Sequence, residues 1–112
     1  MKGTHVGEFE ELILLVSVIL NEDAYVLKIQ QELKEQVNRS VSMGALHATL
    51  TRLEKKRFLS SVMEGGSNER GGRRKRVYRV TSTGKQAIRE AKELRMSLWD
   101  QVPSYNLKIA GA

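Results

Sequence analysis

The sequence predicts a mainly α-helical domain that carries one small two-stranded β-hairpin. Apolar residues recur at intervals of three and four along separate stretches, which is the spacing of one helix face. Two short runs, at residues 59–64 and 76–80, have strand character instead. The chain has 112 residues and no cysteine, so an apolar core rather than disulfides has to stabilise a single domain of this size.

The first helix is expected over residues 7–20. Its first turn holds Glu8, Glu10 and Glu11, and carboxylates there interact favourably with the positive end of the helix dipole. From residue 12 to residue 20 the apolar side chains go nearly all round the helix, and such a helix is covered on more than one side. A chain this short has little material for that cover, so a second copy is expected to pack on Leu12, Leu15, Val16 and Ile19.

The second helix is expected over about residues 24–37, and a turn at residues 38–40 follows it. The apolar stripe of this helix repeats at helical spacing and consists of Val26, Ile29, Leu33 and Val37. The turn formers at 38–40 then separate this helix from the next one.

The third helix is expected from Ser42, which has the character of an N-cap, to about Arg57. Its predicted buried stripe consists of Met43, Leu46, Leu50 and Leu53. The opposite face has small side chains at its amino end and bases at its carboxyl end, namely Gly44, Ala45, Ala48, Arg52, Lys55 and Lys56. Small residues allow close approach and bases favour a polyanion; an ordinary amphipathic surface helix is the alternative.

The hairpin is expected to be long and mobile, with a basic tip. Four of the nine glycines lie in the connection between its strands, which is too long for a tight turn. Six bases fall within ten residues without an acid among them: Arg70, Arg73, Arg74, Lys75, Arg76 and Arg79. Such a run is either a solvated loop or a contact to a polyanion.

Thr81 is expected to cap the last helix, which continues from Ser82 to about Val102 and ends before Pro103. Its apolar stripe has more surface than the hairpin can hide, so the first and last helices are expected to form a homodimer. The dimer residues expected on the last helix are Ile88, Ala91, Leu94, Leu98 and Trp99. Trp99 is interpreted as dimer packing, although a stacking wall for a planar effector is an alternative.

The predicted elements follow the order of a winged helix-turn-helix: two helices, a turn, a third helix and a basic hairpin. The last helix is added to this unit as a C-terminal dimerisation helix. Residues 1–80 would form the DNA-binding domain, residues 81–103 the dimerisation helix and residues 104–112 a tail, in a single compact unit. The formal net charge is +6, and residues 24–80 carry thirteen basic and five acidic side chains. In this fold the third helix enters the major groove, and hairpin arginines neutralise phosphates.

Four segments resemble the PadR family of bacterial transcriptional regulators, over roughly residues 7–100. They are Gly7 to Leu15, Asp23-Ala24-Tyr25, Ser42 to Glu54 and Tyr78 to Gly84. The resemblance implies a homodimeric winged-helix repressor that dimerises through its last helix and often releases DNA on binding a small effector. The family's functional positions correspond to Tyr25, Ser42, Gly44, Ala45, Ala48, Arg52 and the arginines of the hairpin.

Three positions depart from the family pattern. His47 stands where the family usually has tyrosine, and its imidazole can still donate a hydrogen bond to phosphate, so we count it among the expected DNA contacts. Val26 replaces a frequent glycine. Arg57 replaces the usual glycine after the third helix; because a left-handed arginine costs about 1 kcal/mol, this helix is expected to end differently.

Other classes of function find less support in the sequence. An enzyme, a metal site or a bound cofactor is not expected, because no phosphate-binding loop, nucleophile motif or ligand spacing occurs. No apolar stretch is long enough to cross a membrane, so a cytoplasmic protein is expected. An RNA- or ribosome-associated protein would need aromatic stacking platforms, and aromatics are only 5% of the chain. A winged-helix adaptor for other proteins would tolerate loss of the hairpin bases, whereas a DNA-binding protein would not.

Overall fold

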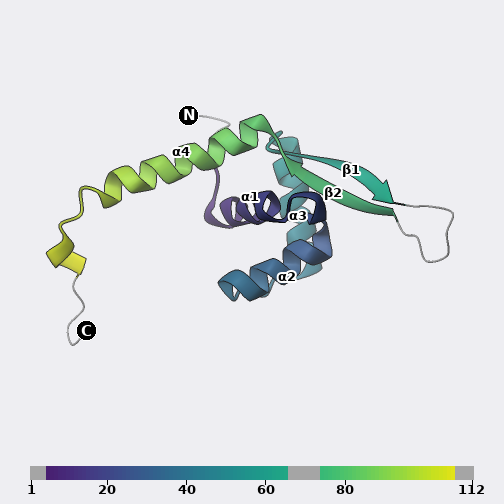
Figure 1. The fold of residues 1–112 in the computed structure, drawn as a ribbon, viewed down its shortest axis with the longest axis horizontal. Helices are drawn as coiled ribbons and strands as arrows, with labels where there is room; N and C mark the ends of the chain where they lie inside the picture. The colour runs from purple at the N-terminus through teal and green to yellow at the C-terminus, as the bar shows by residue number, and fades with distance from the viewer. Residues whose placement is uncertain (1–4, 66–73, 108–112) are drawn as a thin grey trace.

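The computed structural model describes residues 5–65 and 74–107, and it confirms the predicted fold class (Figure 1). Three helices precede a two-stranded antiparallel hairpin, and a long helix follows it. The elements in chain order are α1 (Glu8–Leu20), the 3-10 turn η1 (Asn21–Asp23), α2 (Val26–Val37), α3 (Met43–Lys55), β1 (Leu59–Gly65), β2 (Arg74–Val80), α4 (Ser82–Trp99) and the 3-10 turn η2 (Ser104–Leu107). Over these residues, none of the helices has the length and apolar character to span a bilayer.

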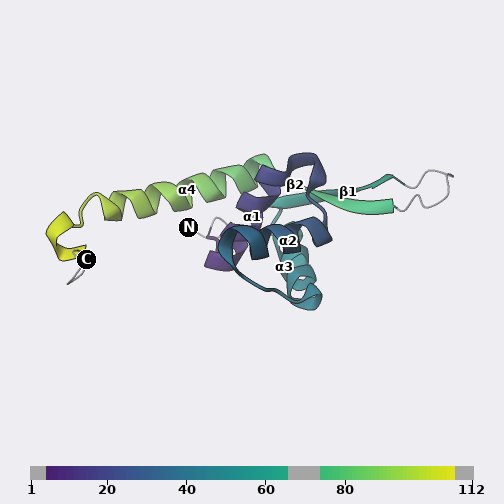
Figure 2. The same cartoon turned by 60° about the horizontal axis from the view of Figure 1, so that its bottom comes forward.

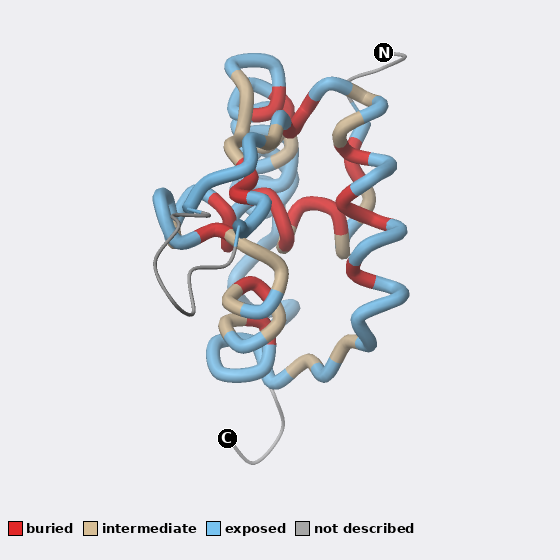
Figure 3. The backbone as a smooth tube through the Cα atoms, turned by 90° about the vertical axis from the view of Figure 1, so that its right-hand side faces the viewer, coloured by how far each residue is buried: buried red, intermediate tan, exposed pale blue. Residues whose placement is uncertain are grey.

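The core lies where α1, α2 and α3 meet the base of the hairpin (Figure 3). Its fully buried large side chains are Ile13, Leu14, Ile29, Leu33, Leu46, Leu50, Leu53 and Phe58. This list confirms most of the predicted stripes of α2 and α3. Val26 is half-buried, and two further members are exposed. Met43 is 39% exposed and Val37 is 42% exposed, because each lies at the end of its helix, where the neighbouring helices no longer cover it.

Residues 24 and 25 join the base of the hairpin instead of α2. The backbone of Tyr25 is extended and forms an isolated bridge with Val77, and the Tyr78 amide donates to the Ala24 carbonyl over 2.8 Å. For this reason α2 begins at Val26 and not at 24, where the sequence had placed its start. The contact fixes the base of the hairpin to the amino end of α2.

The end of α3 differs from the expectation for Arg57. Arg57 is left-handed, with φ 66°, as the glycine of the family pattern would be. Its amide donates to the Glu54 carbonyl, and the Phe58 amide donates to the Leu53 carbonyl. This is the hydrogen-bond pattern of a Schellman motif. Buried Phe58 and Leu53 supply the apolar contact that accompanies the motif.

Two predicted caps are confirmed. The Ser42 hydroxyl accepts from the Ala45 amide over 3.1 Å, and the Thr81 hydroxyl accepts from the Gly84 amide over 3.0 Å. The end of α4 comes earlier than the predicted Val102: after Trp99 the chain tightens into turns, with the Val102 amide donating to the Trp99 carbonyl.

α4 and the hairpin extend from opposite sides of the three-helix body (Figures 1 and 2). The principal extents are 62 × 36 × 22 Å and the Cα radius of gyration is 17.2 Å, against about 13 Å for a compact domain of this length. Every described residue from 92 to 107 is exposed. Among the described residues, the carboxyl half of α4 contacts the three-helix body only near its start, through half-buried Ala91 and the ion pair of Arg95 with Glu11.

Candidate nucleic-acid interface

The outer face of α3 is accessible, and most of its side chains are small. Ser42, Gly44, Ala45, His47 and Ala48 are all exposed. A Cβ added at Gly44 would meet no atom within 4 Å, so nothing within the chain obstructs this end of the helix. The backbone of α3 can therefore come close to a partner here, as the sequence predicted.

Arg52 lies further along the same face and is held by two side chains. Its Nε donates to Glu10 Oε2 over 3.1 Å, and its Nη2 donates to Thr49 Oγ1 over 3.4 Å. Lys56, expected on the open face, also contacts Glu10, with Nζ 2.9 Å from Oε1. Although 53% of the Arg52 side chain is exposed, its guanidinium is tied to α1 by this ion pair.

Glu10 was missed as a site residue, because its sequence position indicated only a dipole-stabilising acid. In the fold its side chain is 8% exposed and also accepts from the Gly7 amide over 2.9 Å. Burial raises the pKa of this carboxyl, but the hydrogen bonds from Gly7, Lys56 and Arg52 outweigh that effect and hold its pKa below the ordinary value. The spacing of Glu10 from Gly7 is that of a capping box, but this local signal does not indicate the contacts with Arg52 and Lys56. Glu8 is exposed and pairs with Arg39.

The bases of the hairpin are exposed but lie on two different faces. Arg76 is opposite Met63 in the register and Lys75 is opposite Glu64, and opposed residues share a face. Arg74 and Arg76 therefore lie on one face and Lys75 on the other. Arg70 and Arg73, also predicted to contact DNA, are outside the described residues.

The two faces of the hairpin contact different parts of the chain: one is linked to α3, and the other to Tyr25 before α2. Arg76 Nη1 donates to Ser61 Oγ over 2.9 Å, and Ser61 Oγ donates to Glu54 of α3 over 2.8 Å. On the other face, Lys75 Nζ lies 4.3 Å from the centre of the Tyr25 ring, just before α2. Both contacts combine a hairpin base with a side chain of the helix-turn-helix unit.

The residues predicted for dimerisation divide into three groups. Leu15, Ile19, Leu94, Leu98 and Trp99 are exposed, at 40% or more. Leu12, Ile88 and Ala91 are half-buried. Val16 does not belong to this surface: it is only 5% exposed and lies in the core of a single chain, because it falls on the side of α1 that faces the other helices.

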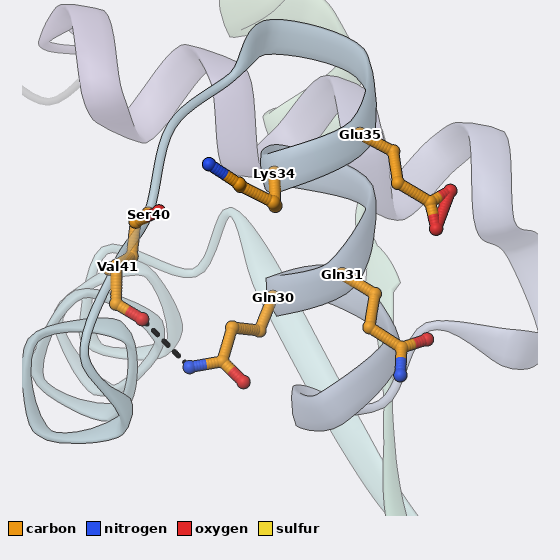
Figure 4. A pocket seen from close by; sticks show the side chains of 6 residues that line it. All are labelled: Gln30, Gln31, Lys34, Glu35, Ser40 and Val41. Atoms are coloured by element: carbon orange, nitrogen blue, oxygen red, sulfur yellow. Dashed lines mark hydrogen bonds between the residues drawn. The ribbon is translucent and has the colours of Figure 1, made fainter.

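The described surface includes two open grooves of similar size. One lies between α2 and residues 40–41, and the side chains that line it are Gln30, Gln31, Lys34, Glu35, Ser40 and Val41 (Figure 4). The Gln30 side chain donates to the Val41 carbonyl over 2.7 Å. The other runs beside α4 and is lined by His5, Val6, Ala87, Glu90, Ala91, Leu94 and Arg95. Within residues 5–65 and 74–107, no group of three or more His, Asp or Glu side chains has metal-binding geometry.

Comparison with known proteins gives consistent results. A family model described as "Transcriptional regulator PadR-like family" matches residues 15–90. A PadR family transcription regulator from Clostridium difficile is 29% identical, with a TM-score of 0.61, over 88% of this chain and 98% of that one. A PadR-like transcriptional regulator from Bacillus cereus is 21% identical, with a TM-score of 0.70, over 90% and 93%. Bacillus subtilis PadR in complex with operator DNA is 19% identical, with a TM-score of 0.59, over 74% and 45%.

Proposed function

The chain belongs to the PadR-like family of transcriptional regulators, and on that basis we propose that it is a homodimeric repressor that binds a specific operator in double-stranded DNA. The observation that carries the proposal is the outer face of α3, where small exposed residues precede Arg52 on one side of the helix and nothing within the chain obstructs Gly44. The named relatives are transcription regulators, and the Bacillus subtilis relative was solved with operator DNA. No catalytic activity is part of the proposal.

In this arrangement α3 lies in the major groove. The residues without bulk at its amino end, Gly44, Ala45 and Ala48, allow the backbone to approach base edges. Ser42 precedes that stretch and His47 lies within it; both contact phosphates, since both are exposed and carry groups able to donate a hydrogen bond. Arg52 is the long cationic side chain on the same face and reaches a base edge or a neighbouring phosphate.

The hairpin acts as the wing and follows the DNA backbone. Arg74, Lys75 and Arg76 are exposed, and a flanking wing contacts phosphates on either side of the groove into which α3 inserts. Tyr25, beneath Lys75, contributes a phenol at the amino end of α2. These contacts position the protein and supply affinity without sequence preference.

The dimer forms through α4 and the outer side of α1. Leu94, Leu98 and Trp99 are each more than half exposed, and a single chain offers nothing to cover them among the described residues. The ion pair between Arg95 and Glu11 holds α4 beside α1, so exposed Leu15 of α1 adds to the surface that a second copy covers. Two copies place two α3 helices on two half-sites, as dimeric helix-turn-helix proteins do. A small effector that alters this dimer would alter operator binding.

The test is a binding measurement on a duplex that the wild-type protein selects from a random-sequence pool. Affinity is measured at several salt concentrations for the wild type and for Arg74→Ala/Lys75→Ala. If both bases contact phosphates in each subunit, the slope of log affinity against log salt becomes less steep by roughly 4. Arg89→Ala/Lys92→Ala removes the same charge from exposed positions of α4 and should leave the slope nearly unchanged. Equal affinity for selected and shuffled duplexes would overturn the proposal.

A further inference from the structure

We infer that Glu10, a residue of α1 outside the helix-turn-helix, is a positioning residue for Arg52 and thereby determines base preference. This inference rests on the proposed function. It starts from the geometry of one carboxylate: Oε2 accepts from Arg52 Nε over 3.1 Å, and both oxygens lie within 3.0 Å of Lys56 Nζ. The carboxylate itself is nearly buried, at 8% exposure of the side chain.

The contacts leave one part of the Arg52 guanidinium for an outside partner. Glu10 occupies Nε and Thr49 engages Nη2, whereas Nη1 has no hydrogen-bond partner among residues 5–65 and 74–107. Thr49 is itself fixed, because its hydroxyl donates to the Ala45 carbonyl over 3.1 Å. A guanidinium fixed at one edge presents its remaining N–H groups in one direction, and paired N–H groups are what recognises guanine O6 and N7.

The charges of Glu10, Arg52 and Lys56 indicate that Glu10 positions the Arg52 guanidinium and does not cancel its attraction for DNA. Glu10 contributes one negative charge, while Arg52 and Lys56 contribute two positive charges, so the cluster keeps a net positive charge toward DNA. Lys56 pairs with the Glu10 carboxylate, and 33% of the Lys56 side chain remains exposed. Arg52 is therefore oriented by Glu10 without losing its attraction for a base edge or a phosphate.

A side chain that is already oriented loses less conformational entropy on binding. A long arginine carries much rotamer freedom, and immobilising it lowers affinity. Because Glu10 already restrains Arg52 in the folded protein, much of this conformational entropy is lost on folding and not on binding DNA. Glu10 should consequently affect the base pair that Arg52 contacts, and should have little effect on binding to unrelated sequences.

The experiment compares Glu10→Ala with Glu8→Ala, which removes the same charge from the same turn of α1 but releases exposed Arg39 instead. Each variant is titrated with the selected duplex and with every single base-pair change in it. Glu10→Ala should reduce the preference at the base pair that Arg52→Ala also affects, by about five- to tenfold. Glu8→Ala should keep that preference. The double variant Glu10→Ala/Arg52→Ala should lose no more preference there than Arg52→Ala alone.

Three results would overturn the inference while leaving the proposed function intact. Glu10→Ala could keep the preference at that base pair, the two substitutions could reduce it additively, or Glu10→Ala could bind the selected duplex more tightly because Glu10 competes with DNA. If Glu10→Ala does not fold, NMR of the wild type decides. The Arg52 Nε–H should exchange slowly with solvent in wild type and in Glu8→Ala, and rapid exchange would contradict the inference. Failure of the wild type to select any sequence would instead overturn the proposed function.

Discussion

Arg57 has a left-handed backbone at the end of α3, and its neighbours impose this conformation. The two hydrogen bonds of the Schellman motif require φ above zero at this position. An L-residue other than glycine pays about 1–2 kcal/mol for that conformation. Burial of Phe58, directly after Arg57, favours the turn strongly enough to offset the cost.

Replacing Arg57 by glycine should therefore stabilise the protein. Glycine removes the left-handed strain but has more freedom in the unfolded chain, so the net gain should be about 0.5–1 kcal/mol in the free energy of unfolding. Lys55→Gly is the matched control, because Lys55 is in the last turn of α3 and should lose about 0.5–1 kcal/mol. Urea unfolding measures both. An equal loss in the two variants would mean that Arg57 is not strained.

The lowered pKa of the Glu10 carboxyl predicts how the free energy of unfolding depends on pH in the acid range. Its pKa in the folded chain is below the ordinary value, so its contribution to stability is complete above about pH 4.5 and is lost as the pH falls through the folded pKa. Glu10→Gln removes this titration and should cost about 1–3 kcal/mol at pH 7. The difference between wild type and variant should shrink as the pH is lowered from 5 to 3. A difference that stays constant over that range would contradict the prediction.

At the scale of the elements, two helical glycines should respond to alanine in opposite ways. Gly44 lies in the first turn of α3 with open space around it, whereas a Cβ at Gly84 of α4 would collide with the Phe58 carbonyl oxygen and approach Val80 Cγ1 to 2.9 Å. Gly44→Ala should raise the free energy of unfolding by about 0.5–1 kcal/mol, and Gly84→Ala should lower it by about 1–3 kcal/mol.

The same pair separates stability from DNA binding. The methyl group of Gly44→Ala would stand on the outer face of α3, so this more stable variant should bind the selected duplex less tightly than wild type. Thermal unfolding and duplex titration of the same samples make the comparison. Unchanged affinity for Gly44→Ala would show that this end of α3 does not approach DNA closely.

The sequence predicts an element well where local chemistry determines it. Ser42 and Thr81 are recognisable as caps, and the leucine spacing of α3 gives its buried stripe. The start of α2 was predicted wrongly because the Tyr25–Val77 bridge joins segments that are distant in the chain. Glu10 was missed for the same reason: its partners Arg52 and Lys56 become its neighbours only when α1 packs beside α3.

At the scale of the whole molecule, the fold leaves an apolar surface that one chain does not cover. α4 extends beyond the body (Figure 2). Its apolar stripe continues past Ala91, the last residue of α4 that packs against the core. Ala87 is buried, Ala91 is half-buried, and Leu94 and Leu98 are exposed by 65% and 58%. Soluble monomers seldom leave such a stripe uncovered. The dimer surface was predictable as an excess of apolar positions, whereas the place of Val16 depended on how α1 is oriented in the core.

A single acid in this stripe should separate the two copies. Leu98→Glu would bury a carboxylate without a partner in the dimer, which costs several kcal/mol, so light scattering at micromolar concentration should change from twice 12.7 kDa to 12.7 kDa. Met96→Glu is the matched control, because Met96 is 49% exposed but lies on the opposite side of α4, and it should remain dimeric. Both variants should keep the wild-type helical content, since neither side chain is part of the core. A wild type that scatters as a monomer, or an unchanged mass for Leu98→Glu, would contradict a dimer built on α4.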